Sequence, residues 1–302
     1  MKTKRIKSKK PIGKQEKIVK AIFYFLIASF ALVCLLPFAL MISSSFMNEK
    51  EIITEGYKLI PKEISFSAYE FLFNNYTKLL SAYKVTITIA VLGTLLGLFF
   101  MSMAGYVLSR KDFKYRNQIA FFIYFTTLFS GGLIPTYILM VNGLHLKDSI
   151  WSMILPGLMS PWSIFLMRNF MKAIPDSLYE SAAIDGAGDF RIYWQIFIPL
   201  AKPSLATIGL FLTLGYWNEW YNAMLYVQST DLFPLQYFLQ RIVSQANIQL
   251  LIQQGITLNT ADLPSESIKM ATAVVAIGPI ILLYPFVQKY FVSGLTIGAV
   301  KG

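Results

Sequence analysis

Residues 179–206, YESAAIDGAGDFRIYWQIFIPLAKPSLA, interrupt an otherwise strongly apolar chain with small and acidic residues. The first half carries Glu180, Asp185 and Asp189, whereas the second half becomes apolar again before the next long hydrophobic run. Three carboxylates in so short a segment are consistent with catalysis, with a hydrated helix face or with a docking site for another protein. The chain on either side of the segment distinguishes these interpretations.

The composition is that of a membrane protein. Of the 302 residues, 55% are hydrophobic and only 14% are charged, which is too apolar for an ordinary soluble domain. Apolar runs of about 20 residues are long enough to cross the bilayer core as helices. Cys34 is the single cysteine and His145 the single histidine, so neither a disulfide framework nor a metal cluster is expected.

Six apolar runs predict an all-α, polytopic membrane protein with six transmembrane helices. The expected spans are 21–46, 83–108, 118–140, 149–170, 203–227 and 268–291. Pro156 and Pro161 predict a kink in the fourth span, and residues 130–132 (Ser-Gly-Gly) with Pro135 predict exposed backbone in the third. These interruptions are candidate elements of a substrate pathway, and ordinary helix packing is the alternative.

The distribution of basic residues predicts the orientation in the membrane. Residues 1–20 carry nine Lys/Arg and one Glu, so this arm holds +8 of the net charge of +11. The run that follows is too long for a cleavable signal peptide. With the N-terminus inside, the inner segments hold 19 Lys/Arg and the outer ones 8, so both termini are expected in the cytoplasm. Nucleic-acid binding is not expected.

The opening segment has the features of a docking helix on the cytoplasmic side. Pro175 and Asp176 predict a helix start, and Ser177 with Glu180 matches a capping box. The small residues of 182–187 recur at helical spacing and are expected to share one face that permits close backbone approach. A catalytic carboxylate pair needs a dry pocket and an acid–base partner. Phosphate-loop, G-x-S-x-G and H-E-x-x-H motifs are also absent.

The spacing within this segment resembles a known family motif. Residues 180–182 (Glu-Ser-Ala), Gly186 and 196–199 (Ile-Phe-Ile-Pro) are similar to the EAA loop, E-A-A-x3-G-x9-I-x-L-P, of membrane subunits of binding-protein-dependent ABC importers. Ser181 replaces the first alanine of that motif and Ile198 replaces its leucine. Residues 217–219 (Trp-Asn-Glu) and the ending 293–302, SGLTIGAVKG, resemble elements of MalG-like carbohydrate permeases.

The resemblance covers nearly the whole chain after the arm 1–20 and implies the type I ABC importer permease fold over 21–302. It implies a transporter subunit and not an enzyme, in a bacterial cell membrane, that imports a sugar, with an oligosaccharide favoured. The implied partners are a second homologous permease, two ATPase subunits that carry ATP and Mg, and an extracellular solute-binding protein. No cofactor is expected in this chain.

The resemblance also implies which residues meet the ATPase. The cytoplasmic coupling loop is expected at about 171–202, and its contact residues would be Glu180, Ser181, Ala182, Asp185, Gly186, Ile196 and Pro199. In the same family the C-terminal tail makes a second contact, for which Gly298 and Lys301 are the candidates. The outer loop 228–267, with helical character over 233–252, is expected to reach toward the solute-binding protein.

The fifth span contains the candidate substrate residues. A carboxylate at bilayer depth should face protein or water, and Gly215, Glu219 and Asn222 fall on one stripe of a continuous helix. Amides, a carboxylate and aromatic rings suit a sugar. The pathway candidates are Tyr216, Trp217, Asn218, Glu219 and Asn222. The competing interpretation is that Asn218 and Glu219 only tie helices together through hydrogen bonds.

The sequence leaves two other classes of function open. An amino-acid, peptide or ion importer would use the same coupling loop. A secondary carrier or a membrane-embedded glycan enzyme would need an inverted repeat or intramembrane acid pairs, and the sequence displays neither.

Overall fold

The computed structural model of the protein describes residues 14–74, 76–253, 266–279 and 281. Within these ranges the chain forms helices and turns, and an isolated antiparallel bridge between Met47 and Ile64 takes the place of any β-strand. The predicted all-α fold is therefore confirmed. The chain divides into two compact units, residues 1–69 with 259–274 and residues 70–258 with 275–302.

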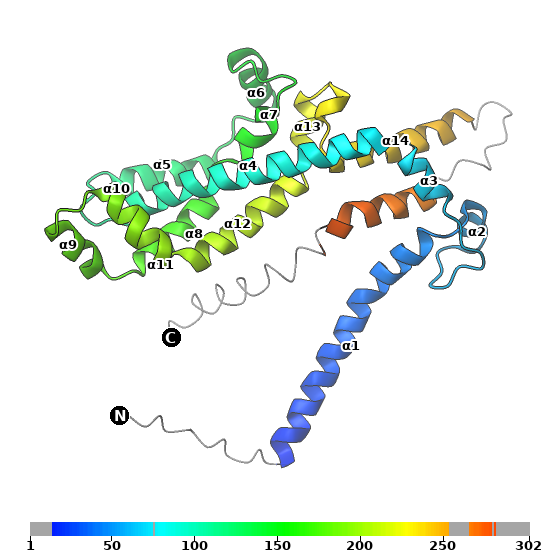
Figure 1. Ribbon diagram of the computed structural model, residues 1–302, viewed down its shortest axis with the longest axis horizontal. Helices are drawn as coiled ribbons and strands as arrows, with labels where there is room; N and C mark the ends of the chain where they lie inside the picture. The colour runs from blue at the N-terminus through cyan, green and yellow to red at the C-terminus, as the bar shows by residue number, and fades with distance from the viewer. Residues whose placement is uncertain (1–13, 75, 254–265, 280, 282–302) are drawn as a thin grey trace. The chain divides into compact units, whose positions relative to one another are not determined.

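The first unit contains α1 (Lys14–Ser44), a helix of 31 residues shown in blue in Figure 1. Its apolar window is 0% buried, and a helix that is apolar all round needs lipid or another protein around it. The helix begins at Lys14, so residues 14–20 of the predicted basic arm are already helical. Lys20 Nζ lies 2.9 Å from Glu16 Oε1, one turn away.

A buried carboxylate organises the rest of the first unit. Glu49, at the start of α2 (Glu49–Glu55), is only 6% exposed. Its carboxylate accepts hydrogen bonds from the backbone N–H groups of Glu266 and Ser267 at 2.9 and 3.0 Å. These N–H groups begin the helical residues 266–279, so Glu49 caps the start of the predicted sixth span. Most of that span beyond 279 lies outside the described residues.

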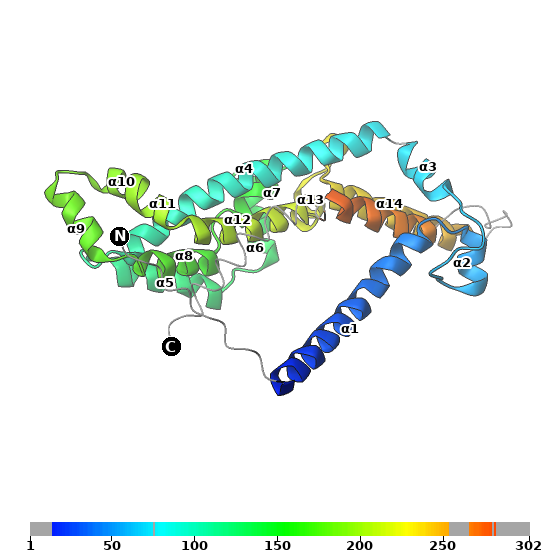
Figure 2. The same ribbon diagram turned by 60° about the horizontal axis from the view of Figure 1, so that its bottom comes forward.

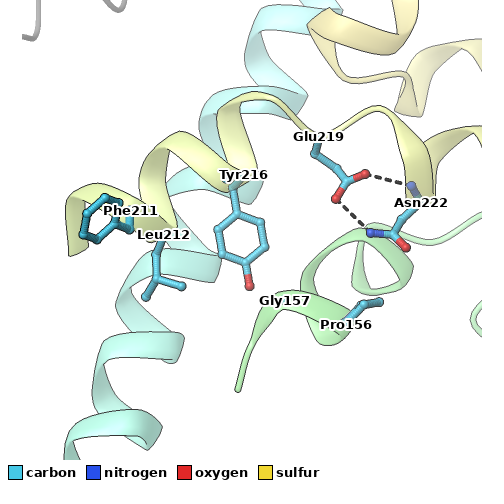
Figure 3. Close-up of a pocket in the computed structure, with 8 residues that line it drawn as sticks. Pro156, Gly157, Phe211, Leu212, Tyr216, Glu219 and Asn222 are labelled. Carbon is cyan, nitrogen blue, oxygen red and sulfur yellow. Dashed lines mark hydrogen bonds between the residues drawn. The ribbon is translucent and has the colours of Figure 1, made fainter. Parts of the chain in front are cut away.

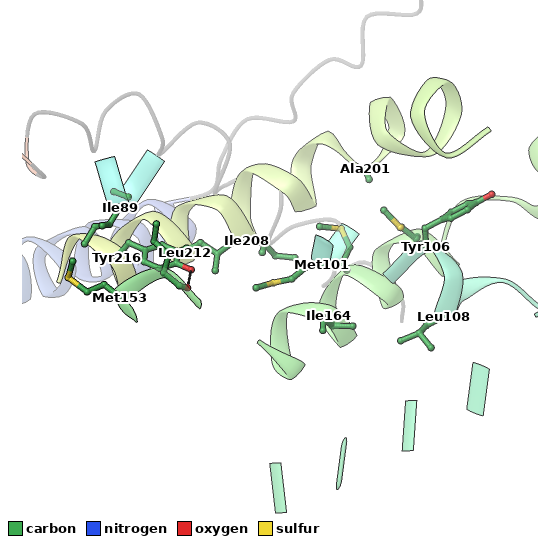
Figure 4. Close-up of a cluster of buried hydrophobic side chains, with 14 of the residues drawn as sticks. Ile89, Met101, Tyr106, Leu108, Met153, Ile164, Ala201, Ile208, Leu212 and Tyr216 are labelled. Atoms are coloured by element: carbon green, nitrogen blue, oxygen red, sulfur yellow. Dashed lines mark hydrogen bonds between the residues drawn. The ribbon is translucent and has the colours of Figure 1, made fainter. Parts of the chain in front are cut away.

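The second unit is built around α4 (Tyr76–Ser109), a helix of 34 residues. It packs along α8 (Pro161–Lys172) and α12 (Lys202–Trp217), as both ribbon views show (Figures 1 and 2). The core between these helices combines aliphatic and methionine side chains with aromatic ones such as Tyr106 and Tyr216, as Figure 4 shows. It includes Ile89, Met101, Ile164, Met167 and Ile208, all almost fully buried.

Shorter helices complete the second unit. They are α5 (Arg116–Leu128), α6 (Leu133–Ile138), α7 (Trp151–Ile154), α9 (Asp176–Ile184), α10 (Asp189–Ile192), α11 (Ile198–Leu200), α13 (Tyr221–Tyr226) and α14 (Leu235–Gln253). π-turns cover Leu139–Gly143 and Tyr193–Phe197, and 3₁₀ turns cover Leu155–Gly157 and Thr230–Leu232. Helix α3 (Ser67–Phe73) joins the first unit to the second along the chain.

In the described part of the chain, α1 and α4 are each long and apolar enough to cross a membrane, and up to four spans result if each of two bent pairs counts as one. The first pair joins Arg116–Leu128 to Leu133–Gly143 with a bend of 114°, and the second joins Asp189–Leu200 to Lys202–Trp217 with a bend of 82°. The bend in the third predicted span falls at residues 129–132, and residues 130–132 are exposed there, as predicted. Gly132 has φ of +88° there, a backbone conformation that favours glycine.

Two predicted spans are more interrupted than expected. In the fourth, 149–170, α7 and the following 3₁₀ turn end at Gly157 and α8 starts at Pro161, because proline suits the first turn of a helix but not its interior. In the fifth, 203–227, α12 ends at Trp217 and α13 starts at Tyr221. A continuous fifth helix was therefore the wrong expectation.

Candidate functional site

The predicted coupling loop (171–202) lies at one end of the second unit, where α9, α10 and α11 gather in both ribbon views (Figures 1 and 2). Helix α9 presents an open surface: Glu180, Ser181 and Asp185 are exposed, and Ile184 is 86% exposed. Ala182 is half-buried against the core. Of the three remaining candidates, Gly186 is exposed just after α9, Ile196 is half-buried in the π-turn and Pro199 is exposed in α11.

The end of α9 explains the glycine of the motif. The Ala187 N–H donates to the Ala182 carbonyl and the Gly186 N–H to the Ala183 carbonyl, both at 3.0 Å. This pair of bonds is a Schellman cap, in which the residue after the helix takes a left-handed conformation. Gly186 does so with φ of +79°. The helix ends at Ile184, so the expected single helical face over 182–187 is incorrect.

A polar cluster that sequence reasoning missed holds the start of α9. The Arg110 guanidinium lies 3.2 Å from the centre of the Tyr179 ring, and Lys111 Nζ lies 2.7 Å from Asp176 Oδ2. The Tyr179 hydroxyl donates to Asp189 Oδ1 at 2.9 Å, which raises the pKa of that hydroxyl. Hydrogen bonding from Lys111 lowers the pKa of the Asp176 carboxyl. The sequence contained one signal for this cluster: the basic residues of 109–117 and the acidic residues of 171–202 lie in two segments that are both predicted to be cytoplasmic.

The other end of the coupling loop is anchored in the core. Tyr193 in the π-turn is 2% exposed, and its hydroxyl lies 2.7 Å from Ser102 Oγ of α4. Phe197 in the same turn is equally buried and packs edge-on against Tyr106 of α4. The loop is therefore held at one end by Arg110 and Lys111, which directly follow α4, and at the other end by α4 itself, while the outer face of α9 between them is open.

A pocket of about 290 Å³ lies where α12 ends and α13 begins (Figure 3). It is lined by Pro156, Gly157, Phe211, Leu212, Gly215, Tyr216, Glu219 and Asn222. Its polar end is formed by Glu219, whose carboxylate accepts hydrogen bonds from the backbone N–H and the side-chain Nδ2 of Asn222, each at 2.8 Å. We call it the Glu219 pocket.

Some of the predicted pathway residues line the Glu219 pocket, but they meet there because the chain turns between α12 and α13. Gly215, Glu219 and Asn222 do line one pocket, but no continuous helix brings them together. The chain turns at Asn218, whose side-chain Nδ2 donates to the Leu214 carbonyl at 2.9 Å. Glu219 then accepts the backbone N–H of Asn222 in the first turn of α13, where a carboxylate suits the helix dipole.

Two of the predicted pathway residues face elsewhere. Trp217 is 6% exposed and its indole N–H donates to the Ala276 carbonyl at 3.3 Å, away from the pocket. Asn218 is exposed and its Oδ1 accepts from Gln236 Nε2 of α14 at 3.3 Å. Both side chains tie elements together, which fits the competing interpretation of Asn218. The same interpretation describes the Glu219–Asn222 bonds equally well.

Two glycines that sequence reasoning did not single out shape the pocket wall. A Cβ on Gly93 would lie 2.4 Å from Tyr216 Cε2, and one on Gly157 would lie 3.2 Å from the Tyr216 hydroxyl oxygen. The Tyr216 ring is thus held between α4 and the turn after α7, and its hydroxyl donates to the Ile154 carbonyl at 2.9 Å. Nothing in the local sequence marks these two glycines, because their contacts are distant along the chain.

The remaining predicted elements have mixed outcomes. Helix α14 (Leu235–Gln253) confirms helical structure in the outer loop 228–267. Gly298 and Lys301 of the predicted tail contact lie outside the described residues. Among the residues that the structure describes, no group of three or more His, Cys, Asp or Glu side chains is arranged to hold a metal ion.

Comparison with known proteins identifies the family. The family of the binding-protein-dependent transport system inner membrane component matches residues 12–297. The chain belongs to this family. The permease is 37% identical over 297 residues to the polygalacturonan/rhamnogalacturonan transport system permease protein YtcP of Bacillus subtilis (strain 168), which covers 95% of the chain and all of that relative. It is 32% identical over 294 residues to the arabinooligosaccharides transport system permease protein AraQ of the same organism, covering 95% and 96%.

A solved structure supports the same assignment. One chain of a bacterial ABC transporter involved in the import of the acidic polysaccharide alginate superposes on the permease with a TM-score of 0.78 and 31% sequence identity, covering 94% of this chain and all of that one. The expected type I importer fold and the resemblance to carbohydrate permeases are thus confirmed. The protein is a membrane component of a transport system.

Proposed function

We propose that the permease is the membrane subunit of an ATP-driven oligosaccharide importer and forms half of its translocation pathway. The Glu219 pocket carries this proposal. It combines a carboxylate and an amide with the aromatic rings of Phe211 and Tyr216, and sugars need both, since their hydroxyls form hydrogen bonds while their C–H faces pack on rings. The names of the relatives, which include polygalacturonan/rhamnogalacturonan and arabinooligosaccharides transport systems, support the same substrate class.

The proposed complex contains a second homologous permease, two ATPase subunits and an extracellular solute-binding protein. ATP and Mg would be bound by the ATPase subunits, and both termini of this chain would lie in the cytoplasm. The apolar window of α1, of which 0% is buried, supports a partner or lipid around that helix. Helix α14 and the loop that contains it would approach the solute-binding protein.

Coupling to the ATPase would use the outer face of α9. Glu180, Ser181 and Ile184 are exposed there, and the Schellman cap ends the helix so that Asp185 and Gly186 remain at the surface. Movement of α9 would pass through the Arg110–Tyr179 contact to the end of α4. Helix α4 holds the Tyr216 ring at Gly93, so the same helix contacts both the coupling loop and the Glu219 pocket.

Filling the pocket tests the proposed function. Gly215 lines it, and no atom lies within 4 Å of the place that a Cβ would take there, so an added side chain enters open space. In the complex reconstituted with its partners, Gly215→Leu should abolish uptake of labelled oligosaccharide, whereas Gly215→Ala should retain most of it. Stimulation of the ATPase by the loaded binding protein should persist in both variants.

Two results would contradict the proposal. One is full oligosaccharide uptake by Gly215→Leu, which would remove the pocket from the pathway. The other is uptake of amino acids or peptides, and not of oligosaccharides, by the reconstituted wild-type complex, which would assign the permease to a different class of importer.

A further inference from the structure

A second cavity, of about 220 Å³, lies where the end of α4, the start of α5 and the end of α8 meet. It is lined by Leu108, Ser109, Lys111, Arg116, Asn117, Arg168 and Lys172. Four of these seven residues are basic and none is acidic. We call it the basic cavity. Its lining belongs neither to the Glu219 pocket nor to the open face of α9.

The two arginines of the basic cavity are held in place by backbone carbonyls. Arg168 Nε donates to the Leu108 carbonyl at 3.1 Å, and Arg116 Nη1 donates to the Arg110 carbonyl at 3.2 Å. Each guanidinium has five N–H donors, so these bonds orient the group and leave further donors for a ligand. Both side chains are half-buried, which is a pre-organised arrangement and not that of a freely moving surface charge.

The positive charge of the basic cavity is mostly uncompensated. Lys111 pairs with Asp176, but across the described ranges Arg116, Arg168 and Lys172 form no ion pair with a carboxylate. Like charges that face one cavity repel each other, and an anion placed between them removes that repulsion. The cavity therefore favours a ligand that carries negative charge and several acceptor oxygens, such as a phosphate group.

The start of α5 adds to this preference. Helix α5 has 13 residues, no side-chain cap at its N-terminus and no acidic residue in its first turn. The N-terminus of a helix presents backbone N–H groups and partial positive charge, and both attract phosphate. Arg116 and Asn117, the first two residues of α5, line the basic cavity.

The side chains that follow indicate where the anion comes from. Along α5, Ile119, Phe121 and Phe122 are 41%, 66% and 67% exposed. Together with α6 this helix is one of the bent pairs that qualify as a membrane span. Anion-binding groups thus lie at the end of an exposed apolar helix face, as a phospholipid requires for its headgroup and its acyl chains. A free phosphate ion has no apolar part that could pack against this face.

We propose that the basic cavity binds the phosphate of an anionic phospholipid headgroup in the leaflet nearest the coupling loop. The acyl chains lie along the exposed apolar side chains of α5. Lys111 lines the cavity and also pairs with Asp176 at the start of α9. The same lysine would therefore contact both the bound lipid and the coupling loop.

The test uses the purified full-length chain in a non-ionic detergent. Short-chain phosphatidylglycerol, short-chain phosphatidylcholine and inorganic phosphate are each titrated in, and the unfolding temperature is followed by tryptophan fluorescence. Phosphatidylglycerol should raise the unfolding temperature at concentrations where the other two do not, because only a ligand of the folded state stabilises it. Lys172→Gln should weaken the apparent affinity for phosphatidylglycerol about fivefold, from the typical contribution of one basic residue near a membrane surface.

Lys114→Gln is the matched control. Lys114 is exposed in the turn between α4 and α5, carries the same charge as Lys172 and does not line the basic cavity, so its variant should bind phosphatidylglycerol as the wild type does. Equal weakening by both variants would show non-specific surface charge and overturn the proposal. Equal stabilisation by phosphatidylcholine, or by inorganic phosphate at the lipid's concentration, would also overturn it. So would a loss of ATPase association in Lys172→Gln with unchanged lipid binding, which would assign the cavity to a carboxylate of the ATPase.

Discussion

The coupling loop and the Glu219 pocket are both built where a helix stops and another begins, but they use the break in opposite ways. In the coupling loop the Schellman cap at Gly186 satisfies the backbone, and the side chains of α9 between its anchors remain exposed. In the Glu219 pocket the side chains themselves complete the break, since Glu219 receives the N–H groups of Asn222 and Tyr216 is clamped between two glycines. The side chains on the outer face of α9 are therefore exposed, whereas Glu219, Asn222 and Tyr216 make hydrogen bonds within the chain.

The largest expected effect is on the free energy of unfolding, and it distinguishes a glycine in the wall of the Glu219 pocket from one that faces its open space. Gly93→Leu should lower the free energy of unfolding by about 3 kcal/mol, because its side chain would overlap the Tyr216 ring. Gly215→Leu adds the same atoms where nothing lies within 4 Å, so its unfolding should resemble that of the wild type. Denaturation in mixed micelles measures both. Equal stabilities of the two variants would contradict the inference that the Tyr216 ring packs tightly against Gly93.

The next effect concerns the anchor of the coupling loop. Arg110→Met should lower the free energy of unfolding by about 1 to 2 kcal/mol through loss of the contact between the guanidinium and the Tyr179 ring. Arg110→Lys keeps the charge but lacks the planar group that stacks on a ring, so it should fall between the wild type and Arg110→Met. If the lysine variant matches the wild type, charge alone holds α9.

The cap of α9 should respond to side-chain type at Gly186. Gly186→Ala should cost about 1 kcal/mol, because a positive φ is unfavourable for residues with a Cβ. Gly186→Asn should cost less, since asparagine tolerates the left-handed conformation. Gly188 has an ordinary φ of −70° and open space around it, so Gly188→Ala is the control. Thermal unfolding of the three variants distinguishes backbone strain from loss of a contact.

A substitution on the outer face of α9 should have almost no effect on stability. Ile184 is 86% exposed, so Ile184→Asp should change the free energy of unfolding by less than about 0.5 kcal/mol. Stimulation of the ATPase by the loaded binding protein should nevertheless be lost in the reconstituted complex. Normal stimulation in this variant would place the ATPase contact elsewhere on the chain.

The smallest effect is a dependence of stability on pH. Lys111 lowers the pKa of Asp176 in the folded chain, so the stabilisation is fully present above the unfolded pKa of about 3.9 and is lost as the pH falls through the folded pKa. Asp176→Asn should remove this component. The measurement is the difference in unfolding free energy between the wild type and the variant from pH 7 down to pH 3, and a constant difference would contradict it.

Local sequence patterns predicted the features that depend on neighbouring residues. The break at residues 129–132 follows from the Ser-Gly-Gly sequence, because glycine relieves the steric cost of a positive φ wherever it stands. The apolar runs correctly located α1 and α4. The start of α9 near Asp176 and the helix in the predicted outer loop were also predicted, since helix-start residues and helical periodicity are properties of adjacent residues. The expected capping box of Ser177 and Glu180 is not formed, because α9 already begins at Asp176 and its N-terminus has no side-chain cap.

The faces of the membrane helices could not be predicted in the same way. In a soluble helix the polar face marks the outside, but a helix surrounded by lipid is apolar on every side, so periodicity does not show which residues face the core. Trp217 was expected beside the substrate, and its indole N–H instead donates to the Ala276 carbonyl. The sequence around Gly93 likewise does not indicate that Tyr216 packs directly against this glycine.

The sequence by itself determined the all-α membrane fold and the family, because length, hydropathy and motif spacing are carried by contiguous residues. Only the tertiary structure decided which side chains meet. The Arg110–Tyr179 contact, the Gly93–Tyr216 clamp and the basic cavity each join helices that are distant along the chain. The free energy of such contacts depends on distance in space, and no local pattern of residues records it.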